Sequence, residues 1–213
     1  YPRREVSLTK HVQEEEKSLM DGESLTIHRI TLHEEVKGKN GFQTSETRWL
    51  VARKMTEIPG KYFKATGQRN VKLPIEMAFQ MEGSIPSRVD LPLYIIFPSD
   101  TPLGLGFVLS ANFRPDTARK GLATDGINGR LNRFLLKRAS GFLELILLFF
   151  KQEITKLPNP RRLEYMKGFL SVLRYDPSPI TLEPYVREYL YGPIRKFIKL
   201  NSLDAKGIWR TAS

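Results

Sequence analysis

The chain lacks cysteine and a long apolar run, and its first residues do not predict a leader segment. Without cysteine it can form neither disulfide bonds nor thiolate metal sites. Its most apolar segment, FLELILLFF at residues 142–150, is far too short to span a bilayer. Arg3, Arg4 and Glu5 stand where a signal peptide would need apolar residues. These absences predict an intracellular, cytoplasmic protein that does not enter membranes. Because the chain begins with Tyr1, we expect it to be part of a longer protein.

Common catalytic signatures are also missing. The sequence contains no Walker A motif, no G-x-S-x-G, no H-E-x-x-H and no complete dinucleotide fingerprint. His28 and His33, followed by Glu34 and Glu35, would lie on opposite faces of a strand, so the pattern predicts no metal site. The glycines of residues 104–106 are better explained by close packing of a helix than by phosphate binding.

The chain has an excess of positive charge. Its formal net charge is +11 and its sequence pI is about 9.8. A charge of this size is compatible with three kinds of partner: nucleic acid, nucleotide phosphate or an acidic protein surface.

The first 120 residues have the patterns of about five strands, at residues 25–33, 46–55, 71–81, 91–97 and 103–113. Asn40-Gly41 predicts a tight hairpin turn between the first two. Pro74 suggests that the third strand lies near a sheet edge. The fourth, at 91–97, is apolar on both faces and is therefore predicted to be central. The acidic run Glu14–Glu16 is interpreted as a solvated helix face.

A helical period begins after residue 130 and predicts helices over 131–157, 161–173 and 183–198. The fold class expected is α+β, a mixed or antiparallel sheet of about five strands packed with a C-terminal helical layer. We expect an α/β sandwich over residues 1–157 and a helical extension over 158–213.

Cations gather in the segment ANFRPDTARKGL, residues 111–122, directly after the last predicted strand. Arg114, Arg119 and Lys120 precede a helix start predicted near 125–130, and free amides at a helix N-terminus favour anions. An arginine can also pair with a phosphate through two parallel hydrogen bonds. The alternative is an ordinary polar loop whose charges only keep it solvated.

This segment resembles a known family. LPLYIIFPSDTPLGLGFVLSANFRPDTARKGL, followed by LNRFLL, is similar to the region downstream of the ATP-binding domain in sacsin-type and NO VEIN-type proteins. Those proteins belong to the GHKL ATPase superfamily, with the ninety-kilodalton heat-shock chaperones, DNA gyrase B subunits and MutL. The match covers about residues 90–137 and departs from the family pattern at Ser110, Lys120 and Leu131, where Asn, an acid and Trp are common.

The resemblance implies a transducer-like middle domain with a fold like ribosomal protein S5 or the heat-shock middle domain. In heat-shock-type members an arginine of this domain touches the terminal phosphate of ATP, and that arginine corresponds to Arg119 here. Lys120 is the alternate for this contact, and Arg114 would support the same field. ATP with Mg would be bound mainly by an upstream domain of the same chain, so this piece alone is not expected to be catalytic. A protein client and a homodimer of the parent protein are further expectations.

A second hypothesis is a basic module that binds nucleic acid or an acidic protein and has no role in hydrolysis. It rests on cations of the helical half, Arg161, Arg162, Lys167, Arg187, Arg195, Lys196 and Lys199. The tyrosines between them, Tyr165, Tyr185, Tyr189 and Tyr191, would either stack on bases or line a core between helices.

Overall fold

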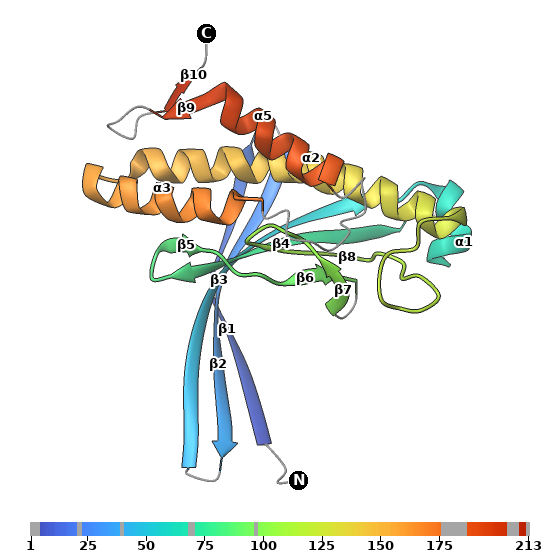
Figure 1. The fold of residues 1–213 in the computed structure, drawn as a ribbon, viewed down its shortest axis with the longest axis horizontal. Coiled ribbons are helices and arrows are strands. Elements are labelled where there is room, and N and C mark those ends of the chain that lie inside the picture. Colours follow the sequence, from blue (N-terminus) through green and yellow to red (C-terminus); the bar gives the residue numbers. More distant parts are fainter. Residues whose placement is uncertain are drawn as a thin grey trace.

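The chain folds as an α+β protein with a mixed sheet, which confirms the predicted class (Figure 1). The computed structural model describes residues 5–20, 23–38, 41–67, 71–95, 98–175, 187–203 and 209–211. Within them lie an eight-stranded sheet, a separate two-stranded sheet and the α-helices α1, α2, α3 and α5. The sheet therefore has more strands than the five predicted.

Three long antiparallel strands open the chain: β1 (Glu5–Met20), β2 (Glu23–Gly38) and β3 (Gly41–Glu57). β4 pairs only with residues 48–57 of β3, so the first part of β3 and the parts of β1 and β2 beside it project from the body as an arm (Figure 1). The helix predicted at Glu14–Glu16 is wrong, because these residues lie within β1. Pairing with β2, which local charge does not reveal, determines the strand conformation there.

The remaining strands are shorter: β4 (Lys72–Glu82), β5 (Ile85–Ser87), β6 (Pro92–Tyr94), β7 (Pro98–Pro102) and β8 (Val108–Ala111). Their order is β1-β2-β3-β4-β8-β6-β7, with β5 beside β4. Only the β6–β8 pair is parallel among the pairings of the described strands.

Two predictions about strand position are corrected. β4 is internal to the sheet although it contains Pro74. β8 pairs only with residues 75–78 of β4, so at Pro74 the strand has only β3 as a neighbour. Of the strand predicted at 91–97, the described residues contain only β6 (Pro92–Tyr94), which lies between β8 and the outermost strand β7 and not in the middle of the sheet. Residues 96 and 97 lie outside the described residues. Leu93 and Ile95 are nevertheless buried.

The helices form a layer on one face of the sheet (Figure 1). α2 (Gly126–Lys156) runs the length of the body, and α3 (Asn159–Leu173) and α5 (Gly192–Leu200) pack on it. Smaller elements are a 3-10 turn (Gly60–Tyr62) with α1 (Phe63–Thr66), a π-helical turn (Arg187–Tyr191), and the strands β9 (Asn201–Leu203) and β10 (Trp209–Thr211). The start of the helix predicted at 183–198 lies outside the described residues, as does Asn40 of the predicted hairpin turn.

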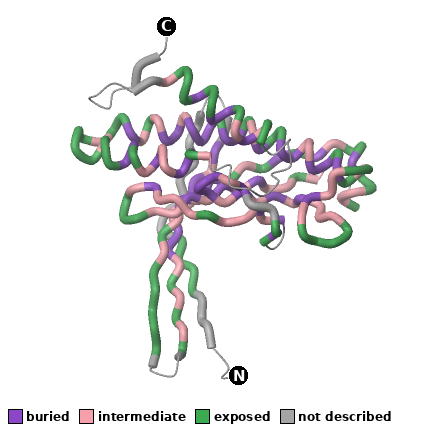
Figure 2. Tube along the Cα trace, viewed as in Figure 1, coloured by how far each residue is buried: buried purple, intermediate pink, exposed green. Residues whose placement is uncertain are grey.

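The core lies between the sheet and α2 (Figure 2). Alternate residues of β4, Ile75, Met77 and Phe79, are fully buried, as the period-2 pattern predicted. Phe150 of α2 stands at its centre, with ring centroids 4.9 Å from both Phe79 and Phe169. Residues from both sides of the predicted boundary at 157 belong to this one hydrophobic cluster. Among the described helices none is long and apolar enough to cross a membrane.

Two glycines at this layer, Gly106 and Gly141, differ in the space that a Cβ atom would have. A Cβ on Gly106 would lie 2.9 Å from the Cα of Val172 in α3, in agreement with the predicted close packing of a helix. Gly141, in the middle of α2, is exposed, and a Cβ there would meet no atom within 4 Å.

Gly141→Ala should therefore stabilise the protein. Glycine inside a helix costs roughly 0.5–1 kcal/mol relative to alanine, and no contact opposes the added methyl group. Urea denaturation is expected to show a free energy of unfolding higher by about that amount. Gly106→Ala is the opposing control and should lower it, because its methyl group meets the α3 backbone. A Gly141→Ala protein less stable than wild type would contradict the open geometry over this residue.

Candidate functional site

The cationic segment forms a compact loop between β8 and α2, at the end of the molecule where α2 begins (Figure 1). Pro115 and Leu122 form an antiparallel bridge across it. Inside the bridge, the N–H of Asp116 donates to the carbonyl of Gly121 at 2.9 Å. The loop is therefore a hydrogen-bonded hairpin with a defined tip.

Arg119 occupies that tip in a left-handed conformation, with a φ of 58°. Its N–H donates to the Asp116 carbonyl at 3.1 Å and closes a turn, and the next N–H, of Lys120, donates to Asp116 Oδ1 at 3.0 Å. Arg119 is the only residue other than glycine with positive φ in the described part of the chain. A side chain in this conformation costs about 1 kcal/mol or more, and hairpins of this kind usually have glycine there.

The base of the loop is fixed to α2 by Asn132, which is fully buried. Its Oδ1 accepts from the N–H of Arg114 at 2.7 Å, and its Nδ2 donates to the carbonyls of Arg114 and Ala123 at 2.8 and 2.9 Å. One side chain thus holds both strands of the loop. It acts as a clamp between the loop and the helix.

Two further bonds hold the loop in place. Arg133, next along α2, donates from Nη1 to the Thr124 carbonyl at 2.8 Å. On the other side the N–H of Asp100 in β7 donates to the Lys120 carbonyl at 2.8 Å. The loop is therefore anchored both to the helical layer and to the last strand of the sheet.

The three predicted site residues differ in how they are placed. The side chains of Arg119 and Lys120 are exposed. Arg114 is half-buried, and its Nε is buried with no hydrogen-bond partner among the described residues. The tip therefore presents two cations to the outside, whereas Arg114 is turned partly inward at the base.

The start of α2 adds to the positive field. The N-cap is the exposed Asp125, but the first turn contains no acidic residue and the helix continues with Arg130 and Arg133. Cations at this end oppose the helix dipole, whose positive pole lies at the N-terminus. The loop and the helix end together form a surface suited to an anion that approaches from outside.

Sequence reasoning did not find Asn132 as part of the site. The sequence feature that could have identified it is a polar residue between Leu131 and Leu135 on the apolar stripe of a helix. Such a residue would be buried, and a buried polar group needs hydrogen-bond partners.

No group of described residues has the composition and spacing of a metal site. His28 and His33 both lie on β2, and the His33 ring lies edge-on to that of His11 of β1, with ring centroids 5.2 Å apart.

The cations and the tyrosines of the helical half differ in exposure. Most of its predicted cations are exposed: Arg161, Lys167, Arg187, Arg195, Lys196 and Lys199. Arg162 instead donates to the carbonyls of Leu157 and Thr155 at the end of α2.

The tyrosines of this half pack mainly against other side chains. Tyr165 is buried, and its burial raises its pKa, with the nearby Glu153 carboxylate as a second cause. Tyr191 packs against Tyr175 at 4.8 Å between centroids, Tyr189 packs on the core, and Tyr185 lies outside the described residues.

No protein-family model, curated protein or solved structure matches this chain. The membership of the GHKL superfamily that the sequence suggests therefore stays a prediction, as do the transducer-like fold and the role of Arg119.

Proposed function

We propose that this chain is a coupling domain of a GHKL-type ATPase, which presents Arg119 to the terminal phosphate of ATP bound by an upstream domain of the same polypeptide. The guanidinium would stabilise negative charge that develops on the transferred phosphoryl group, as an arginine finger does. Lys120 is the alternate donor, and Arg114 would contribute through its field at the base of the loop. Mg would accompany the ATP on the upstream domain.

The observation that carries this proposal is an arginine in a left-handed conformation at an exposed tip. Within the described residues its guanidinium forms no hydrogen bond or ion pair that would offset the backbone cost. Glycine or asparagine would fit the turn at lower cost. Costly conformations of this kind concentrate at functional sites, where the side chain is needed for something other than stability.

The anchoring of the loop supports the same role. A finger must hold its charge in a fixed place, because a displacement of about 1 Å can cost on the order of 10²-fold in rate. Asn132, Arg133 and the β7 backbone fix the loop from two sides, so it would move with α2 as one body.

The decisive experiment replaces Arg119 by glycine in a polypeptide that joins this chain to its ATP-binding domain. ATP turnover should fall while nucleotide affinity stays nearly the same, because the contact is made in the transition state. Unchanged turnover would remove Arg119 from the mechanism.

A second candidate function, binding of nucleic acid or an acidic protein, is favoured by the exposed cations of α5, Arg195, Lys196 and Lys199. Tyr165 is buried and offers no stacking surface, and the half-buried ring of Tyr191 packs against Tyr175. If it holds, the chain should be retained on generic DNA or RNA at low salt, and the affinity should decrease steeply as salt increases. Absence of retention at low salt would eliminate the nucleic-acid form of this candidate.

A further inference from the structure

The main sheet has a second apolar face, on the side opposite the helices (Figure 1). Met77 of β4 is buried in the core, so the next residue, Ala78, points to the other face of the sheet. Ala78 is paired with Val51 of β3 and with Val108 of β8, and paired residues lie on the same face. The centre of this face is therefore apolar, and the described helices do not cover it.

A groove crosses this face from one strand to the next. Its volume is about 370 Å³, within the range of small-molecule sites. Its lining runs from Lys10 of β1 across β2, β3, β4 and β8 to Tyr94 of β6. Neighbouring strands lie about 4.8 Å apart, so these five steps give a length of about 24 Å. A groove of this length and volume is long and narrow.

The floor and one wall of the groove are apolar. The floor is formed by Ile30, Leu32, Val51, Ala78 and Val108. Trp49 of β3 also lines the groove and is half-buried. Its indole N–H donates to Thr47 Oγ1 at 3.2 Å, so the polar atom of this ring is already satisfied. Water in contact with these side chains is easily displaced by an apolar ligand.

The lining carries one positive charge without a partner, at one end. Lys10 is exposed and forms no ion pair within the described residues. The acidic residue of the lining, Glu76, is paired with Arg53 at 3.5 Å. Glu34 of β2 is outside the lining, and its Oε2 accepts from Ser45 Oγ at 3.3 Å. The groove is therefore suited to an apolar ligand with a single negative charge at one end.

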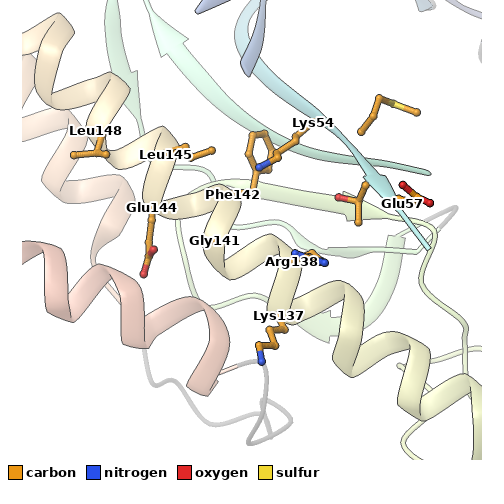
Figure 3. A pocket seen from close by; sticks show the side chains of 11 residues that line it. Lys54, Glu57, Lys137, Arg138, Gly141, Phe142, Glu144, Leu145 and Leu148 are labelled. Carbon is orange, nitrogen blue, oxygen red and sulfur yellow. The ribbon is translucent and has the colours of Figure 1, made fainter. Parts of the chain in front are cut away.

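A larger cavity, between the end of β3 and the middle of α2, lacks this pattern (Figure 3). Its lining mixes cations with carboxylates, among them Lys54, Arg138 and Glu57. Charges of both signs do not select one class of ligand there.

We propose that the groove on the open face of the sheet binds a fatty acid, with the carboxylate at Lys10 and the acyl chain laid across the strands over Ala78. A saturated chain is long, narrow and apolar and has one negative charge at its end, so it matches the groove in shape and in charge. A helix, with a diameter of about 10 Å, is a poor match for a narrow groove. The site does not involve the Arg119 loop, so its test is independent of the proposed role in ATP hydrolysis.

The experiment uses Trp49 as a reporter. The sequence contains two tryptophans, and Trp209→Phe leaves Trp49 alone. Titration with octanoate, decanoate and dodecanoate, each below its micelle concentration, should shift Trp49 emission saturably to shorter wavelength. The Kd should decrease about twofold for each added methylene, which is half the effect of full burial because one side of the chain stays in water.

Three variants locate the two ends of the ligand. Lys10→Gln should weaken decanoate about threefold and leave 1-decanol unchanged, because the alcohol has the chain without the charge. Lys64→Gln removes an exposed cation of α1 outside the groove and should change neither ligand by more than about 1.5-fold. Ala78→Phe keeps every charge, suits a strand and fills the floor, so decanoate should bind at least about tenfold more weakly.

The proposal is overturned if Kd does not depend on chain length, if the Trp49 emission does not shift, or if folded Ala78→Phe binds decanoate normally. Equal losses in Lys10→Gln and Lys64→Gln would also overturn it, because the carboxylate would then have no defined place. Sedimentation tests the other possible occupant: a dimer that Ala78→Phe dissociates and dodecanoate leaves intact would show a second copy on this face, and the fatty-acid assignment would be wrong.

Discussion

Replacing Arg119 by glycine should leave the fold at least as stable and, under the proposed function, strongly lower ATP turnover. The left-handed backbone at this position costs an arginine about 1 kcal/mol, and glycine relieves that cost. Glycine also makes the unfolded chain more flexible, so the net gain in the free energy of unfolding is expected between 0 and about 1 kcal/mol. Turnover by the polypeptide that includes the ATP-binding domain should fall on the order of 10³-fold.

The two readouts test different claims. Denaturation of this chain tests the strain at the tip, and Ala118→Gly is the matched control, because it adds the same flexibility without relieving positive φ and should lower stability. Turnover tests the role of the guanidinium, and Arg119→Lys should retain only part of it, because an ammonium lacks the planar fork. A stable Arg119→Gly protein with full turnover would support the claim of backbone strain at the tip but contradict the proposed role of the guanidinium.

Replacing Asn132 by leucine should cost roughly 2–4 kcal/mol of unfolding free energy. The variant leaves the Arg114 N–H and the Ala123 carbonyl without their partner in a partly buried place, while the Arg114 carbonyl still accepts from the Ala123 N–H. Each such group costs about 1–3 kcal/mol, and the contributions are not additive. Urea denaturation measures the loss, and hydrogen exchange should show faster opening of residues 113–124 than of the core.

Asn128→Leu is the control for this change, because Asn128 is an exposed residue one turn earlier on α2. It should alter stability by less than about 0.5 kcal/mol. Asn132→Asp should destabilise the protein at least as much as leucine, since it loses both donated bonds and buries a carboxylate oxygen beside two carbonyls. If Asn132→Leu unfolds like wild type, the clamp does not hold the loop.

Local pattern predicted the parts of this fold that depend on local geometry. In β4, the alternation of apolar and polar residues identified the face that packs on the core. In α2, apolar residues at helical spacing identified the buried stripe. The strand predicted at 91–97 was misplaced because an apolar run gives burial but not position: Leu93 is buried, yet its strand, β6, lies beside the outermost strand. Pro74 was misplaced for a related reason, since sequence does not reveal how far a neighbouring strand extends.

The candidate site also has a part that the sequence could predict and a part that it could not. Its cations could be found from sequence because they cluster along the chain before a helix start. The clamp joins residues 18 and 9 positions apart in sequence. Such contacts have no local period, so only the folded arrangement brings them into view.

The sequence by itself determined the α+β class, the course of α2 and α3, the core face of β4 and the concentration of cations before α2. These follow from side-chain spacing along one element. The tertiary structure alone decided that Glu14–Glu16 lies in a strand, that Arg119 is left-handed at an exposed tip and that Asn132 holds the loop. Each depends on pairing between distant segments, whose free energy is gained only when the chain has closed around its core.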